Sequence, residues 1–162
     1  MSTTASSMVW PNTQQPLPGE RRIVTGVNEA GRSLIVSDGV APNRLLRPSL
    51  PGAHVLWATG EGAASGDDPA PEGHDFGFHS KHGSLLRVVD FPPDHSYDPN
   101  KLTQMLDENG VRSQGPVRHF WFHKTQSLDY AIVLEGEIYA MLDEGETLMR
   151  AGDILIQRAT NH

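Results

Sequence analysis

The sequence predicts one all-β domain with a single short helix, and three observations support this prediction. The chain has 162 residues, which is the usual length of one domain and enough to bury a core. It contains 16 glycines and 12 prolines, a content that favours short strands and turns over long helices. Its C-terminal part alternates short apolar runs with tight Glu-Gly turns, as in a small β-barrel or sandwich.

The composition excludes several classes of function. A net charge of −7 argues against a nucleic-acid partner. The absence of cysteine excludes a disulfide scaffold, a thiolate metal site and a cysteine nucleophile. The sequence has neither the run of about 18 apolar residues that spans a membrane nor an N-terminal secretory signal. We therefore expect a cytoplasmic protein without a membrane partner or a nucleotide cofactor.

The N-terminal part of the chain predicts an arm followed by a hairpin. Residues 1–20 are rich in Ser, Thr, Gln and Pro, so we expect a flexible arm before a domain over residues 21–162. The stretches 22–25 and 33–37 are typical of strands, and the turn at 26–31 joins them.

The next segment combines loops with two further strands. Residues 41–51 are predicted to form a loop, and residues 54–58 a short strand. The stretch 60–77 is predicted to be a surface loop from its Gly, Ala, Asp and Pro content, and its acidic residues lack the spacing of a calcium loop. Residues 84–91 form an apolar strand that two prolines terminate.

One helix is predicted over residues 99–108. Asp98 is suited to cap its N-terminus, Pro99 to occupy its first position, and Gly110 to follow its end. Its apolar stripe consists of Leu102, Met105 and Leu106.

After the helix the chain returns to short strands. We expect them at about 118–123, 128–135, 137–142, 146–150 and 153–157. The turns at Glu135-Gly136 and at 143–145 predict hairpins between neighbouring strands, so that this region forms a meander.

Three side chains with ligand or acid/base chemistry lie at the ends of these strands: His123, Asp129 and His162. Burial of a carboxylate such as Asp129 costs several kcal/mol unless it is paired or bound to a metal, although a strand-end Asp can also face water. His119 is a weaker candidate, because four steps along a strand place it about 13 Å from His123. We assign His119 to packing or to the rim.

The pattern over residues 115–162 resembles the cupin family. The first motif of that family has two histidines separated by one residue, then a glutamate and a glycine. With Gly136 aligned to the motif glycine, Asp129 stands at the glutamate position. His123 then stands at the first histidine, and Thr125 at the second.

The second cupin motif is matched more loosely. Gly152 stands at its glycine, and His162 lies one residue before its histidine. Arg158 and Thr160 occupy its proline and glycine positions. The sequence over residues 115–162 is similar to that of a group of small single-domain cupins. In that group Thr and Asp replace the second histidine and the glutamate of the first motif. The resemblance implies a double-stranded β-helix, or jelly-roll barrel.

The resemblance also implies a metal site. His123, Asp129 and His162 are then both the ligands and the catalytic residues, and the metal is a divalent Fe, Zn, Mn or Ni ion. Thr125, at the position of the second histidine, is a poor metal ligand. His79 or His82 is therefore a candidate for the missing ligand. The same substitution leaves open a metal-free enzyme in which a histidine acts as general base and Asp129 orients it.

We interpret the chain as an enzyme, a lyase, isomerase or oxygenase, that acts on a small organic or polyketide-like molecule. The alternatives are the metal-free enzyme and a non-catalytic binding module, since the cupin fold hosts all three. We expect the substrate to contact Trp121, Thr125, Tyr130 and Gln157. A homodimer is expected as well, because the sequence ends soon after the second motif and an open sheet edge favours association.

Overall fold

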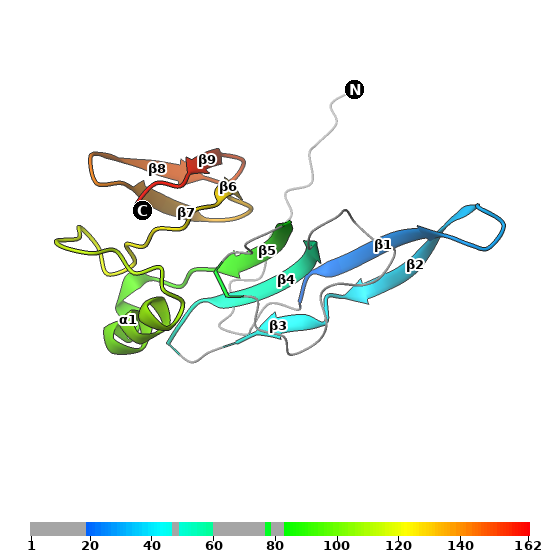
Figure 1. The fold of residues 1–162 in the computed structure, drawn as a ribbon, viewed down its shortest axis with the longest axis horizontal. Coiled ribbons are helices and arrows are strands. Elements are labelled where there is room, and N and C mark those ends of the chain that lie inside the picture. The colour runs from blue at the N-terminus through cyan, green and yellow to red at the C-terminus, as the bar shows by residue number, and fades with distance from the viewer. Residues whose placement is uncertain (1–18, 47–48, 60–76, 79–82) are drawn as a thin grey trace, which may run out of the picture.

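The structure is a computed structural model that describes residues 19–46, 49–59, 77–78 and 83–162 (Figure 1). Within these ranges the chain forms nine strands, one α-helix and one 3-10 helix. Neither helix is long and apolar enough to cross a membrane. Most of the predicted arm and most of the loop predicted at 60–77 lie outside the described residues.

The first two strands form the predicted hairpin. β1 (Arg21–Val27) pairs antiparallel with β2 (Ser33–Val40). The turn is held by Asn28, whose side-chain oxygen accepts hydrogen bonds from the backbone N–H groups of Ala30 and Arg32, both at 3.0 Å. An Asn that bonds the backbone ahead of it in this way is a common cause of tight turns.

A second sheet has the order β3-β4-β5 and is antiparallel throughout. Its strands are β3 (Asn43–Leu45), β4 (Gly52–Thr59) and β5 (Ser84–Asp90). The loop predicted at 41–51 was therefore wrong in part, since it contains β3. Three residues are too few to show the alternation by which a strand is recognised.

The helix forms where the sequence predicts it. The 3-10 helix η1 (Asp94–Ser96) precedes α1 (Pro99–Glu108). The Asp98 carboxylate caps α1 by accepting from the N–H of Asn100 at 3.0 Å. The buried core contains the apolar residues of α1, which are Leu102, Met105 and Leu106. It also contains Val111, which follows the helix.

The C-terminal strands pair differently from the predicted meander. β7 (Glu137–Met141) and β8 (Glu146–Arg150) do form a hairpin. However, β6 (Leu128–Ile132) pairs with β9 (Ile154–Arg158) and not with β7, so the predicted hairpin at Glu135-Gly136 was wrong. The ladder continues past β6 because the N–H of Val133 donates to the carbonyl of Asp153 at 3.1 Å.

The strand predicted at 118–123 was also wrong. The N–H of Phe122 donates to the carbonyl of His119 at 3.1 Å, which closes a turn, and only an isolated bridge joins His123 to Arg112. Phe120 and Trp121 both pack against the α1 core. Two adjacent side chains cannot reach the same core from a strand, because a strand directs them to opposite faces.

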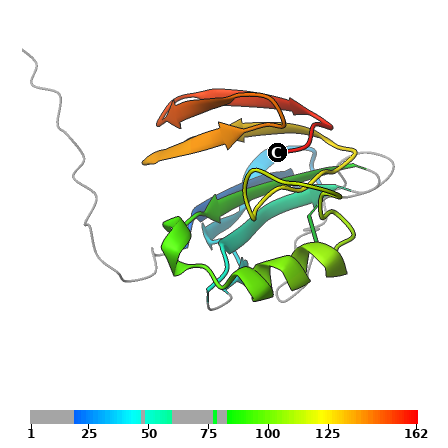
Figure 2. The ribbon, with the colours of Figure 1, turned by 90° about the vertical axis from the view of Figure 1, so that its left-hand side faces the viewer.

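Seen from the side, the strands form two layers (Figure 2). The β6–β9 and β7–β8 pairs make the upper layer, and β1 to β5 make the lower one. α1 lies beside one end of the lower layer, and the segment after it rises to the upper layer (Figures 1 and 2). The prediction of an all-β fold with one α-helix is confirmed.

Candidate active site

The centre of the site is a pair of histidines that are far apart in the sequence. The N–H of His123 donates to the carbonyl of His162 at 2.7 Å, and the N–H of His162 donates back to the carbonyl of His123 at 3.0 Å. Residues that exchange both hydrogen bonds in an antiparallel pair direct their side chains to the same face. The two ring centroids are accordingly 4.3 Å apart.

The backbone fixes the tautomer of both rings. Nδ1 of His123 lies 2.9 Å from the carbonyl oxygen of Trp121, and Nδ1 of His162 lies 2.9 Å from that of Thr160. A carbonyl oxygen can only accept, so each Nδ1 carries a proton and donates it. In a neutral imidazole this leaves a lone pair on Nε2, which for both rings has no hydrogen-bond partner among the described residues.

Burial keeps His123 neutral. The pKa of His123 is lowered to about 4, chiefly by burial and also by the nearby His162, whereas the hydrogen bond to the Trp121 carbonyl and the Asp129 charge act to raise it. The ring is therefore uncharged at neutral pH, with its one proton on Nδ1. A group with so low a pKa is a weak base at that pH but is well suited to bind a metal or to accept a hydrogen bond.

Aromatic side chains form the wall around this pair. The ring of Phe78 meets His123 edge-on at a centroid distance of 5.0 Å, and the Trp121 ring lies 6.4 Å from the same imidazole. Phe91 packs edge-on against the other side of Trp121 at 5.7 Å. These rings contribute to the partial burial of His123.

Asp129 lies near the two histidines but does not form a metal-binding cluster with them. It is half-buried on β6 and faces Gln157, its register partner on β9. Its charge is close enough to raise the pKa of His123. Nevertheless, the described part of the chain holds no group of three or more His, Asp or Glu side chains that could bind a metal ion.

The remaining candidates lie apart from the imidazoles or outside the described residues. Thr125 is buried, and its hydroxyl lies 2.8 Å from that of Ser127. Tyr130 is 68% exposed and lies on the face of β6 opposite Asp129. The His119 ring lies 3.1 Å from the Asp94 carboxylate and packs on its neighbour Phe120. His79 and His82 lie outside the described residues.

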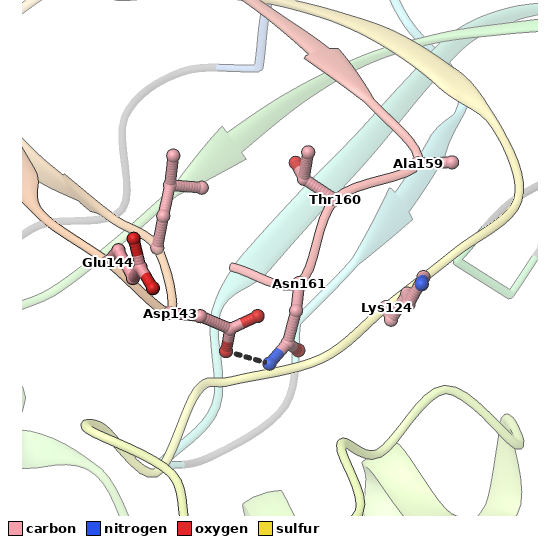
Figure 3. A pocket seen from close by; sticks show the side chains of 7 residues that line it. Lys124, Asp143, Glu144, Ala159, Thr160 and Asn161 are labelled. Carbon is pink, nitrogen blue, oxygen red and sulfur yellow. Dashed lines mark hydrogen bonds between the residues drawn. The ribbon is translucent and has the colours of Figure 1, made fainter.

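The structure also contains a pocket that the sequence did not predict (Figure 3). It measures about 520 Å³ and is lined by Lys124, Leu142, Asp143, Glu144, Ala159, Thr160 and Asn161. The side-chain amide of Asn161 donates to Asp143 at 2.7 Å, and its oxygen accepts from Ser113. Lys124 and Asn161 each adjoin one of the histidines in the sequence, but neither histidine lines the pocket.

No protein-family model matches the chain. Relatives among curated proteins do match it over most of its length. The cupin-domain-containing oxidoreductase fogC of Aspergillus ruber is 31% identical over 158 residues, which cover 92% of this chain and 66% of that protein. The cupin-domain-containing oxidoreductase srdD of Neurospora crassa is 31% identical over 156 residues, which cover 91% and 68% of the two chains.

The chain belongs to the cupin family. A further relative matches half of this cupin more strongly. Phomopsin biosynthesis cluster protein D of Diaporthe leptostromiformis is 51% identical over 81 residues, which cover 49% of this chain and 31% of that protein. The chain spans about two thirds of the length of the two cupin-domain-containing oxidoreductases, at 66% and 68%.

Proposed function

We propose that this cupin is an enzyme that transforms a small organic molecule at the His123–His162 pair, and that the two imidazoles bind a divalent transition metal. The observation that carries the proposal is the pairing of the two rings at a centroid distance of 4.3 Å, with no hydrogen-bond partner for either Nε2 atom among the residues that the structure describes. The names of the relatives, two oxidoreductases and one biosynthesis cluster protein, support an oxidation or reduction in secondary metabolism.

The donor chemistry of the pair fits such a metal. Imidazole nitrogen is a preferred ligand of Fe, Zn and Ni, and the ligand is the neutral ring. Metal-binding histidines usually donate their other N–H to a carbonyl or a carboxylate, as both rings do here. Asp129 is the proposed third ligand, because its charge acts on His123. The described side chains form no three-residue metal cluster as they stand, so its carboxylate would have to turn toward the imidazoles when the metal binds.

The surrounding chain orients the imidazoles and covers part of the site. The carbonyls of Trp121 and Thr160 hold the two imidazoles in one tautomer. Phe78 and Trp121 pack near the His123 ring. The bound metal would supply Lewis-acid or redox chemistry.

A metal-free acid/base enzyme is the second candidate, and the position of Thr125 favours it. This residue stands where the family motif has its second histidine, and its hydroxyl is engaged with Ser127. The site then has one ligand fewer than the motif specifies. In this mechanism the Nε2 of His162 or His123 takes a proton from the substrate, and Asp129 stabilises the resulting cation.

Elemental analysis of protein purified without a His-tag tests the metal. Wild type and His95→Ala, a control at an exposed histidine, are expected to hold one transition metal per chain after incubation with Fe²⁺ or Zn²⁺. His123→Ala and His162→Ala are expected to hold little. A wild type that binds no metal would reject this part of the proposal and favour acid/base catalysis. A His123→Ala variant with full metal content would place the metal elsewhere.

Turnover tests the enzymatic half of the proposal. Aromatic aldehydes, phenols and small acids incubated with wild-type protein should yield a product that is absent with the double variant His123→Ala/His162→Ala. Equal conversion by the two proteins would show that the reaction does not occur at this pair.

A further inference from the structure

Two buried hydrogen-bond donors lie side by side in the aromatic wall of the site. The Tyr97 hydroxyl and the Trp121 indole Nε1 are both buried, and neither has a hydrogen-bond partner within the described residues. Their rings meet edge to face at a centroid distance of 5.6 Å and an angle of 87°. Tyr97 as a whole is only 7% exposed.

Both groups are donors at neutral pH. Burial raises the pKa of Tyr97 to about 12, a rise that the neighbouring Trp121 N–H opposes, so the hydroxyl keeps its proton. An indole N–H has no acceptor capacity at all. The Trp121 N–H is near enough to the Tyr97 oxygen to oppose the rise of its pKa, but the two atoms do not meet in hydrogen-bond geometry. Each therefore carries the free-energy penalty of an unmade buried hydrogen bond. One shared acceptor atom would remove both penalties.

We propose that Tyr97 and Trp121 together bind one acceptor oxygen of the substrate, a carbonyl or phenolic oxygen on a flat aromatic molecule. Trp121 connects this subsite to the histidine pair, since its ring lies 6.4 Å from the His123 ring and its carbonyl accepts from His123. The inference rests on the proposed function for its claim that the ligand is the substrate. The binding chemistry itself does not depend on a metal.

The surrounding rings explain why the ligand is aromatic. Phe91 meets Trp121 edge-on at 5.7 Å, and Phe120 meets Tyr97 edge-on at 5.9 Å. Such edge-to-face contacts extend readily to one more ring. Phe91 is 52% exposed, so the cluster reaches the surface. Binding must separate the Tyr97 and Trp121 side chains, because neither donor atom contacts solvent in this structure.

A matched pair of probes tests the subsite. Acetophenone has the required oxygen, and α-methylstyrene has a methylene group in its place with nearly the same shape. Ligand-observed NMR titrations with the purified protein should show that acetophenone binds about 3- to 10-fold more tightly, the ratio expected for one or two hydrogen bonds. The ¹³C resonance of the acetophenone carbonyl should also move downfield on binding.

Tyr97→Phe keeps the ring and removes only the donor. This variant should bind acetophenone more weakly and reduce the downfield shift, while its affinity for α-methylstyrene stays unchanged. Tyr139→Phe is the control, since Tyr139 is exposed on β7, and it should behave as wild type. Thermal unfolding of both variants verifies that they fold.

The outcomes separate this inference from the proposed function. Equal affinity of wild type for the two probes, or equal weakening of both by Tyr97→Phe, would overturn the subsite and assign the two donors to a buried water. A probe preference that persists in EDTA-treated protein supports the subsite even where the metal proposal fails, because neither metal nor turnover enters the measurement.

Discussion

At the scale of single residues, the protonation of His123 follows from where its ring is buried. The pKa of about 4 lies below the ordinary value of 6.5, so the unfolded chain binds a proton more readily than the folded one. The stability that His123 contributes is therefore complete above about pH 6.5 and is lost as the pH falls toward 4. A shift of this size corresponds to about 3 kcal/mol.

Urea unfolding at several pH values measures this effect. Between pH 6.5 and 4 the free energy of unfolding of wild type should fall more steeply than that of His123→Asn, because Asn cannot take up the proton. The other titrating groups are common to both proteins, so the difference in slope reports mainly on the proton of His123. Parallel curves for the two proteins would contradict the low pKa, as would a ¹H NMR titration of the His123 ring with a midpoint near 6.5.

Asn161 is predicted to stabilise the chain rather than to act on a substrate. Its amide joins Ser113 to Asp143, and these residues belong to separate segments. Asn161→Ala should lower the free energy of unfolding by about 1–2 kcal/mol through two lost hydrogen bonds. Asn161→Asp should cost more, because it places a second carboxylate against Asp143. Urea unfolding would measure both variants, and an unchanged Asn161→Asp stability would refute this role.

At the scale of elements, α1 shows how much a local cap contributes. The Asp98 carboxylate accepts from Asn100 N–H at 3.0 Å and from Lys101 N–H at 3.4 Å. Asp98→Ala should therefore destabilise the protein by about 1 kcal/mol, whereas Asp98→Asn should be nearly neutral, since Asn caps as well. The measurement is the midpoint of chemical unfolding. Equal losses of stability in Asp98→Ala and Asp98→Asn would show that the charge of Asp98 stabilises the helix and that its capping hydrogen bonds do not.

Elements with local signals could be predicted, and those set by distant partners could not. The capping Asp98 and the stripe of apolar residues define α1 within one short window of sequence. The pairing of β6 with β9 joins Ile132 to Ile154, which lies 22 positions later in the sequence. The Phe120-Trp121 turn depends on a core that the helix provides. Sequence periodicity contains neither piece of information.

The same distinction between local sequence signals and distant contacts applies to the candidate site. His123 and His162 could be singled out from strand ends and family motifs, and the backbone pairing that joins them is visible only in the structure. The orphaned donors of Tyr97 and Trp121 leave no pattern in the sequence, because burial without a partner is a property of packing. Tyr130, by contrast, has a prominent position in the motif region but lies on an exposed face.

At the scale of the whole molecule, the outer face of the β6–β9 pair is apolar and exposed. Its side chains are Leu128, Tyr130, Ile132, Ile154 and Ile156, with exposures between 55% and 68%. Within the described residues, β6 and β9 hydrogen-bond only to each other, so each has one free edge. Contiguous apolar surface and unpaired strand edges both favour association.

We therefore expect the chain to form a homodimer through this face. Sedimentation velocity at micromolar concentration should show a dimer for wild type. Tyr130→Lys and Ile156→Lys, at cross-strand partner positions, should shift it to monomer, because a dimer would have to bury their charges. Gln104→Lys is the control, since it adds the same charge on the exposed side of α1, where the new side chain can still pair with Glu108. A monomeric wild type would contradict the interface, and a dimer that survives both lysines would move it to another surface, for which the exposed β1–β2 hairpin is the next candidate.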